Sequence, residues 1–193
     1  MKQATIVIDD NLEALGLKSV MKPDSIALYT SEVPVLSQAR LVISDPGEYE
    51  VSGISIFGIA ARGHMDETDK QTATIYKIQF DDLRVAVIGH IHPDLTEDHL
   101  EEIGTIDILI TPVGGNSYTL DAIGALQIIK KIEPKLIIPT HYDDSKIKYP
   151  VPQQSLAEAL KGLSMEPKET LAKFKPKPAD FGEAAQLIIL ERQ

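Results

Sequence analysis

The sequence has 193 residues, a formal net charge of −10 and a hydrophobic fraction of 43%. This length and composition suit one globular domain, which we place over residues 1–193. The acidic charge argues against the basic face of a nucleic-acid binder. The chain has no cysteine, which excludes disulfides, a thiol nucleophile and thiolate zinc sites.

Short β-branched runs bounded by turn residues fill the first half of the chain. They predict strands at 4–8, 25–29, 41–44, 54–60, 74–80 and 83–88. The second half alternates, with a helix at 96–104, a strand at 106–111, a helix at 120–132, a strand at 136–138 and a helix at 155–163. Closing strands are predicted at 170–174 and 186–190. This order predicts packed sheets with helices outside them.

No apolar stretch reaches the roughly 20 residues that a membrane helix needs. Asp9 and Asp10 interrupt the first apolar run, so no signal peptide is expected. We therefore predict a cytoplasmic protein that binds an unknown small-molecule substrate and neither membranes nor nucleic acid. A homo-oligomer is a candidate assembly.

Three histidines each follow a run rich in apolar residues, namely His64, His90 and His141. In α/β sheets, sites form outside the carboxyl ends of the strands. Three neutral imidazoles delivered there from distant parts of the chain could meet around one metal ion. The alternative for each ring is a hydrogen bond to a loop carbonyl.

Several segments resemble the metallo-β-lactamase-fold hydrolases, and most closely their ascorbate-lactonase-like, metal-dependent branch. Residues 46–59 read PGEYEVSGISIFGI and look like a strand pair of that branch, and residues 61–91 are similar to the strand and hairpin around its third histidine. The most specific match is residues 106–142, with a PVGG loop, a following helix and a PTHY end.

The resemblance implies a mixed α/β (α+β) fold, the four-layer αββα sandwich of that family. Its two sheets pack face to face, with helices on both outer sides. It also implies an active site at one edge of the sandwich that usually holds two zinc ions. Zinc lowers the pKa of a bound water to about 7 and so supplies hydroxide for hydrolysis.

The chain departs from the family pattern at most ligand positions. A His-x-His-x-Asp-His loop is the main motif of the family, but the corresponding residues 30–34 read TSEVP. His90 stands where the family has a bridging aspartate. Only His64 and His141 keep the family residue, so a two-zinc centre is not expected.

One rebuilt site would place a single zinc or other divalent ion on His64, His90 and His141, since catalytic zinc usually has three protein ligands and a water. Glu32 and Asp66 are the candidate catalytic carboxylates, and Asp66 is also a candidate partner for a ligand imidazole.

Weaker candidates surround this site. His92 is an alternate ligand because it forms a His-x-His pair with His90, and Asp143 is an alternate acceptor beside His141. Gly114, Gly115 and Tyr118 are expected to line the same cleft.

Two functions remain open from the sequence, with a third less favoured. One is a metal-dependent hydrolase of an ester, lactone or phosphoester. Another is a catalytically inactive member of the fold that serves as a binding or oligomerisation module. The third is a metal-free enzyme using Ser31, Ser117 or Tyr118, which would need an activating base within reach.

Overall fold

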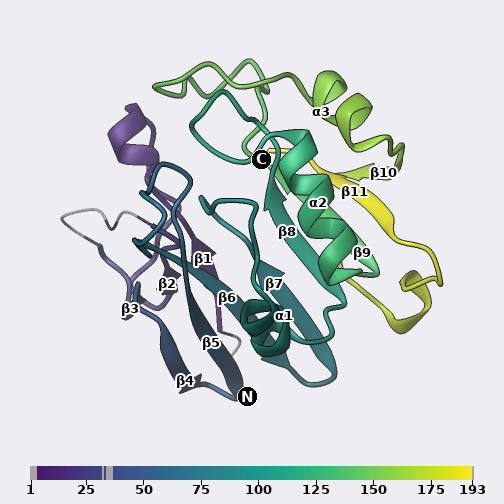
Figure 1. The fold of residues 1–193 in the computed structure, drawn as a ribbon. Coiled ribbons are helices and arrows are strands. Elements are labelled where there is room, and N and C mark those ends of the chain that lie inside the picture. The colour runs from purple at the N-terminus through teal and green to yellow at the C-terminus, as the bar shows by residue number, and fades with distance from the viewer. Residues whose placement is uncertain (1–3, 32, 34–36, 193) are drawn as a thin grey trace.

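The computed structural model describes residues 4–31, 33 and 37–192 of the chain. Within these residues the fold consists of two β-sheets and three α-helices (Figure 1). The mixed α/β class expected from the sequence is confirmed. The same residues contain no helix long and apolar enough to cross a bilayer.

The smaller sheet has three parallel strands in the order β1–β2–β3. Its central strand, β2 (Ile26–Leu28), is completely buried, which agrees with its purely apolar sequence. The flanking strands are β1 (Ile6–Ile8) and β3 (Leu41–Ile43).

The larger sheet has eight strands. Pairing is parallel from β10 through β11, β9 and β8 to β7, and antiparallel from β7 through β6 and β5 to β4. Strands β5, β7, β8 and β9 therefore all end at the same edge. In sheet order the strands are β10 (Pro167–Leu171), β11 (Gln186–Leu190), β9 (Leu136–Thr140), β8 (Ile108–Pro112), β7 (Leu83–Val87), β6 (Ala73–Phe80), β5 (Ile54–Ala61) and β4 (Gly47–Val51).

The helices begin at residues suited to capping. Thr96, Asp121 and Ser155 each accept a hydrogen bond from a backbone N–H of the first turn, which satisfies a donor that the helix itself leaves free. These caps start α1 (Glu97–Ile103), α2 (Ala122–Ile132) and α3 (Leu156–Leu163). Two short 3-10 helices are η1 (Leu12–Leu15) and η2 (Pro178–Asp180).

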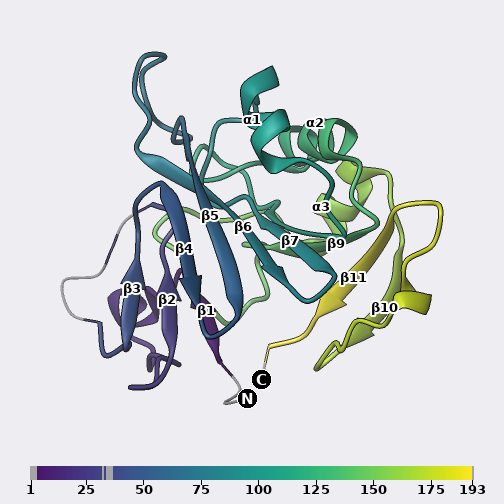
Figure 2. The same ribbon diagram turned by 90° about the horizontal axis from the view of Figure 1, so that it is seen from below.

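Two hydrophobic cores lie on opposite faces of the large sheet. One packs the three α-helices against the sheet, and the other packs the small sheet against its opposite face. Figure 2 shows the small sheet and the helices α1 and α2 on different sides of the large sheet. The resemblance implied helices on both outer sides, whereas the α-helices among the described residues all belong to the first core.

Two strands differ from the pattern-based prediction by more than the one or two residues that separate the other predicted and observed element ends. The strand expected at 170–174 is β10, Pro167–Leu171, because its register with β11 begins at Pro167, while Phe174 packs against the inter-sheet core. Strand β4 is absent from the strands predicted by the apolar pattern, and only the family resemblance indicated a strand pair there.

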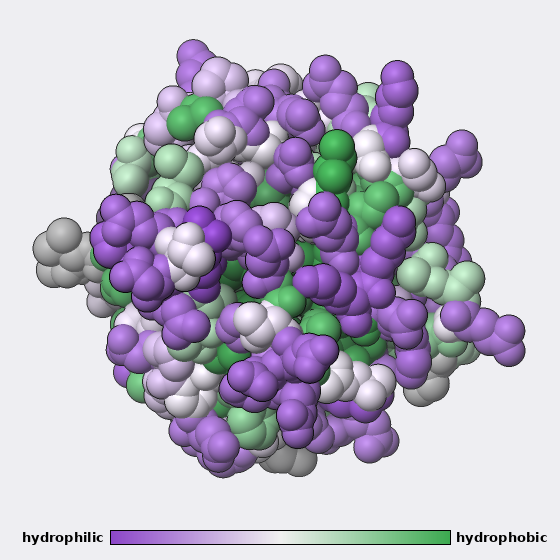
Figure 3. All heavy atoms as spheres, viewed as in Figure 1, coloured by the Kyte–Doolittle hydropathy of each residue, from purple (hydrophilic) through white to green (hydrophobic). Residues whose placement is uncertain are grey.

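Polar side chains cover most of the face in Figure 3, and hydrophobic ones show mainly in the hollows between them.

Candidate functional site

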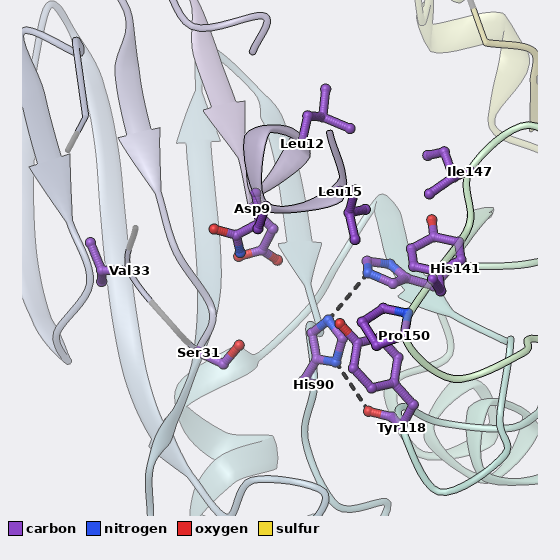
Figure 4. Close-up of a pocket in the computed structure, with 13 residues that line it drawn as sticks. Asp9, Leu12, Leu15, Ser31, Val33, His90, Tyr118, His141, Ile147 and Pro150 are labelled. Carbon is purple, nitrogen blue, oxygen red and sulfur yellow. Dashed lines mark hydrogen bonds between the residues drawn. The ribbon is translucent and has the colours of Figure 1, made fainter. Parts of the chain in front are cut away.

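A cavity of about 470 Å³ lies at the edge where strands of both sheets end. Asp9 follows β1, His90 lies just beyond β7 and His141 follows β9, and all three line the cavity. Figure 4 shows both imidazole rings pointing into it, with the Tyr118 carbonyl beside His90. The strand-end prediction therefore holds for His90 and His141.

The two imidazoles are in direct contact. Their Nε2 atoms lie 3.2 Å apart, and His90 Nδ1 lies 3.2 Å from the Tyr118 carbonyl oxygen. A carbonyl can only accept, so Nδ1 of His90 carries a hydrogen and donates it. When His90 is neutral, its Nε2 lone pair faces His141, and the hydrogen between the two rings belongs to His141.

His141 is held neutral by its surroundings. Burial, together with the neighbouring His90, lowers the pKa of His141 to about 3, because a charged imidazole is poorly solvated there. Its backbone has a φ of 54°, a left-handed conformation that is uncommon outside glycine. Such conformations concentrate at functional sites.

Asp9 is fixed against the end of β2. Its two carboxylate oxygens accept hydrogen bonds of 2.7 Å from the Thr30 backbone N–H and from the Thr30 hydroxyl. Burial raises the pKa of Asp9, while these hydrogen bonds and the nearby His90 oppose the rise. Thr30 can lie this close to β7 because residue 89 is glycine, where any Cβ would overlap the Thr30 side chain.

The His90–His141 pair fits a shared divalent cation. Two nitrogens bound to one zinc at 2.0–2.1 Å in tetrahedral geometry lie about 3.3 Å apart, close to the observed 3.2 Å. The donation from His90 Nδ1 to a backbone carbonyl is also typical of a metal-bound histidine. Across the residues that the structure describes, however, no three His, Asp or Glu side chains are grouped as a metal site.

The predicted three-histidine site is therefore not assembled, and His64 is the residue left out. Its backbone N–H donates to the His90 carbonyl at 2.8 Å, beside a bridge between Gly63 and Ile91. Its ring lines a neighbouring cavity, where Nδ1 is buried without a hydrogen-bond partner. His64 and His90 thus line one cavity together, but His64 is not grouped with both rings of the pair as a metal site in the described part of the chain.

Asp66 organises its own loop. Its carboxylate accepts hydrogen bonds from the Gly63 N–H at 2.8 Å, the Thr72 N–H at 2.9 Å and the Thr72 hydroxyl at 2.8 Å. The Thr72 backbone bond is the main cause that lowers the pKa of Asp66. The predicted contact between Asp66 and the His64 ring is absent, because these loop groups bind the carboxylate instead.

The alternate ligand His92 and the alternate acceptor Asp143 also form hydrogen bonds within their own loops. His92 Nδ1 accepts a hydrogen bond from the Asp94 backbone N–H at 3.4 Å. Asp143 accepts from the Ser145 backbone N–H at 2.7 Å. Neither hydrogen bond involves the His90–His141 pair.

The remaining cleft residues have distinct roles. Tyr118 lines the cavity, and its ring meets that of His90 edge-on at 5.2 Å. Gly114 is required because any Cβ there would overlap the His141 carbonyl oxygen, and Gly115 adopts a φ of 70°. Ser31 lines the cavity. Glu32 lies outside the described residues.

Sequence reasoning missed Asp9 and Tyr149 as cavity residues. Asp9 follows an apolar strand just as His90 and His141 do, so the strand-end rule could have included it. Tyr149 stacks on His141 with ring centroids 5.5 Å apart. It comes from a proline-rich loop whose sequence carries no comparable signal.

Comparisons with known proteins agree with this architecture. Residues 8–141 match the family model described as a beta-lactamase superfamily domain. A metallo-β-lactamase superfamily protein of Thermotoga maritima superposes with a TM-score of 0.71 and 22% identity, covering 100% of this chain and 92% of that one. A metallo hydrolase of Ignicoccus hospitalis gives a TM-score of 0.55 and 18% identity over 97% of this chain and 76% of its own.

Sequence relatives match over a shorter stretch. A metal-dependent hydrolase of Carboxydothermus hydrogenoformans is 46% identical over 44 residues, which are 23% of this chain and 19% of that protein. Another metal-dependent hydrolase, from Salinibacter ruber, is 40% identical over 42 residues, or 22% of this chain and 18% of the relative. The matched part thus spans about a fifth of each curated relative.

Proposed function

We propose that this chain, which belongs to the β-lactamase superfamily, is a metal-dependent hydrolase whose centre is reduced to one divalent cation on His90 and His141. The substrate would be an ester, a lactone or a phosphoester. The names of the sequence relatives support the hydrolytic class, and zinc is the cation that we expect.

One observation carries this proposal. The two Nε2 atoms lie 3.2 Å apart in a cavity of about 470 Å³, which is the spacing of two ligands on one zinc. Two protein ligands are fewer than the usual three of catalytic zinc, so we expect binding weaker than in a complete site.

The residues around the histidine pair would orient the ligands and place a carboxylate beside them. The Tyr118 carbonyl orients His90. Burial keeps His141 neutral near neutral pH, and His141 would bind the cation through Nε2 by carrying its one hydrogen on Nδ1 instead. Asp9, held by Thr30, places a carboxylate near His90. When bound, a divalent cation supplies a nucleophile at neutral pH and polarises the bond to be cleaved.

The test is a calorimetric zinc titration of the tag-free protein. We expect about one zinc per wild-type chain, and binding lost or weakened at least about tenfold in His90→Ala and His141→Ala. His92→Ala is the matched control, because the His92 ring accepts a hydrogen bond from the Asp94 backbone N–H in its own loop. His64→Ala should also keep the affinity, since His64 is not grouped with the pair as a third ligand among the described residues.

Two results would contradict the proposal. One is a wild-type protein that binds no zinc while its fold is intact, and the other is zinc binding that survives both substitutions in the pair. Turnover is then tested by zinc-dependent hydrolysis of 4-nitrophenyl acetate and bis(4-nitrophenyl) phosphate.

The second candidate is an inactive binding module. The observation that favours it is the lack of a third grouped ligand among the described residues. A protein that binds zinc stoichiometrically but hydrolyses neither ester would support this candidate over the hydrolase.

A further inference from the structure

A second cavity, of about 480 Å³, adjoins the cavity that holds the histidine pair. His141 lines only the first of the two, and His64 lines only the second. The residues that line both, and so place the cavities side by side, are Asn11, Ser31, His90 and Tyr118. Each volume lies within the roughly 300–1,000 Å³ of small-molecule sites. The two cavities are thus two lobes of one cleft, with His90 at their boundary.

Apolar side chains from two separate segments wall the first lobe. They are Leu12 and Leu15 of η1 and Ile147 and Pro150 of the loop that follows β9. Figure 4 shows these four on the side of His141, whereas Ser31 lies on the opposite side of His90. No residue of η1 is fully buried, so a ligand in this lobe would remove accessible apolar surface from water. The first lobe therefore suits an alkyl or aryl group.

The second lobe offers hydrogen-bonding groups that the protein itself does not use. Across the residues that the structure describes, the side chains of Asn11 and Ser31 form no hydrogen bond. Nδ1 of His64 is buried and likewise lacks a partner there, and a buried polar atom left unpaired costs free energy that a ligand would recover. An amide, a hydroxyl and an imidazole nitrogen can together donate and accept. A ligand group that carries hydroxyls matches this set, because each hydroxyl also donates and accepts.

Other residues of the second lobe are less available to a ligand. The Asp66 carboxylate already accepts hydrogen bonds from the Gly63 and Thr72 N–H groups and from the Thr72 hydroxyl. Met65 is 76% exposed, so its side chain offers little enclosed apolar surface. Recognition in this lobe therefore falls to the three unused groups.

We infer that the substrate of this cleft is amphipathic, with an alkyl or aryl group in the first lobe and a hydroxyl-bearing group in the second. The bond that joins the two groups passes His90, beside the proposed cation. The reacting carboxyl or phosphoryl group would face that cation, so the selection lies in the two groups that flank it. The inference rests on the proposed function for the cleavage of this bond, whereas the two-lobed binding needs no metal.

The test uses phenyl glyceryl ether, in which a stable ether joins an aryl group to two hydroxyls. Anisole and glycerol represent its separate halves. Affinity is measured by ligand-observed NMR on chelator-treated protein, so that neither zinc nor turnover contributes. We expect the ether to bind at least about tenfold more tightly than either half, because its second group binds within the same molecule as the first.

Variants of the second lobe test its polar groups. Ser31→Ala and Asn11→Ala should each weaken the ether by about threefold or more and leave anisole unchanged. The start of η1 should survive Asn11→Ala, because the Asn11 side chain forms no capping hydrogen bond. Ser145→Ala is the matched control, since Ser145 lines neither lobe, and it should bind the ether as the wild type does.

A variant of the first lobe tests its apolar wall. Leu15→Ser should weaken both anisole and the ether, since it removes apolar surface that the aryl group would contact. Leu17→Ser is the matched control, because Leu17 is 37% exposed and lines neither lobe. It should keep both affinities.

Three results would overturn the inference. The ether binds no more tightly than one of its halves, it does not bind at all, or folded variants of either lobe bind it as the wild type does. Failure of the zinc titration would instead remove the hydrolase and leave the two-lobed binding intact. Failure of the ether would leave the zinc titration and the proposed function standing.

Discussion

Asp107 at the start of β8 offers a quantitative test of the large sheet. Its side chain is only 4% exposed and accepts from Arg84 Nε at 3.0 Å and Lys135 Nζ at 2.9 Å. Burial alone would raise the pKa of Asp107, but these hydrogen bonds outweigh it and lower the pKa to about 2. A fall from 3.8 to about 2 corresponds to roughly 2.4 kcal/mol.

The Asp107→Asn variant should lose most of this contribution to the free energy of unfolding. Because Arg84 and Lys135 are 33% and 43% exposed, water screens the pair, and we expect a loss of about 2 kcal/mol. The folded pKa lies below the unfolded one, so the stabilisation is present above about pH 4 and disappears as the pH falls toward 2. The difference between wild type and variant should shrink over the same range.

Urea denaturation at pH 7 and at several points down to about pH 2 measures this difference. The control is Asp82→Asn, which alters an exposed carboxylate in the turn between β6 and β7 and should change stability by less than about 0.5 kcal/mol. A variant as stable as the wild type at neutral pH, or a loss that is independent of pH, would refute the ionic account.

Three other substitutions probe the sheet contact and the site. Tyr76→Phe removes a buried hydroxyl whose one hydrogen faces the carbonyl oxygens of Tyr29, just after β2, and Ile43 in β3, each 3.1 Å away. Urea denaturation should show a loss of about 2 kcal/mol. Gly114→Ala would push its Cβ into the His141 carbonyl, so a zinc titration should show at least tenfold weaker binding, roughly the effect of a 1 Å misplacement. Thr30→Val removes a hydroxyl donor from Asp9, and carboxyl NMR should report a higher pKa for Asp9.

The strand-end rule predicted the position of the site better than the direction of its side chains. Val- and Ile-rich runs place the backbones of His90 and His141 at one edge of the sheet, because parallel strands end together there. His64 follows β5 at the same edge, yet its ring lines the neighbouring cavity. Ring direction depends on how the segment beside the strand pairs, and here residues 62–64 pair with 90–92.

Other features depend on contacts that a linear pattern does not contain. Tyr149 reaches the cavity from a loop that the sequence marks only by its prolines, and the stacking partner His141 lies eight positions earlier. The boundaries of β10 depend on the register with β11. Asp9 is different, because its place after β1 was visible in the sequence.

Position 90 limits what kind of centre this cavity can hold. A bridging aspartate, as the family resemblance implies, offers two oxygens that can each contact a different cation. In His90, Nδ1 is occupied by donation to the Tyr118 carbonyl, so Nε2 alone remains as a ligand. The single lone pair on His90 Nε2 can bind only one cation, and it points toward the Nε2 atom of His141. We therefore expect His90 to offer no bridge between two cations, so that a second ion would need a set of ligands that excludes this residue.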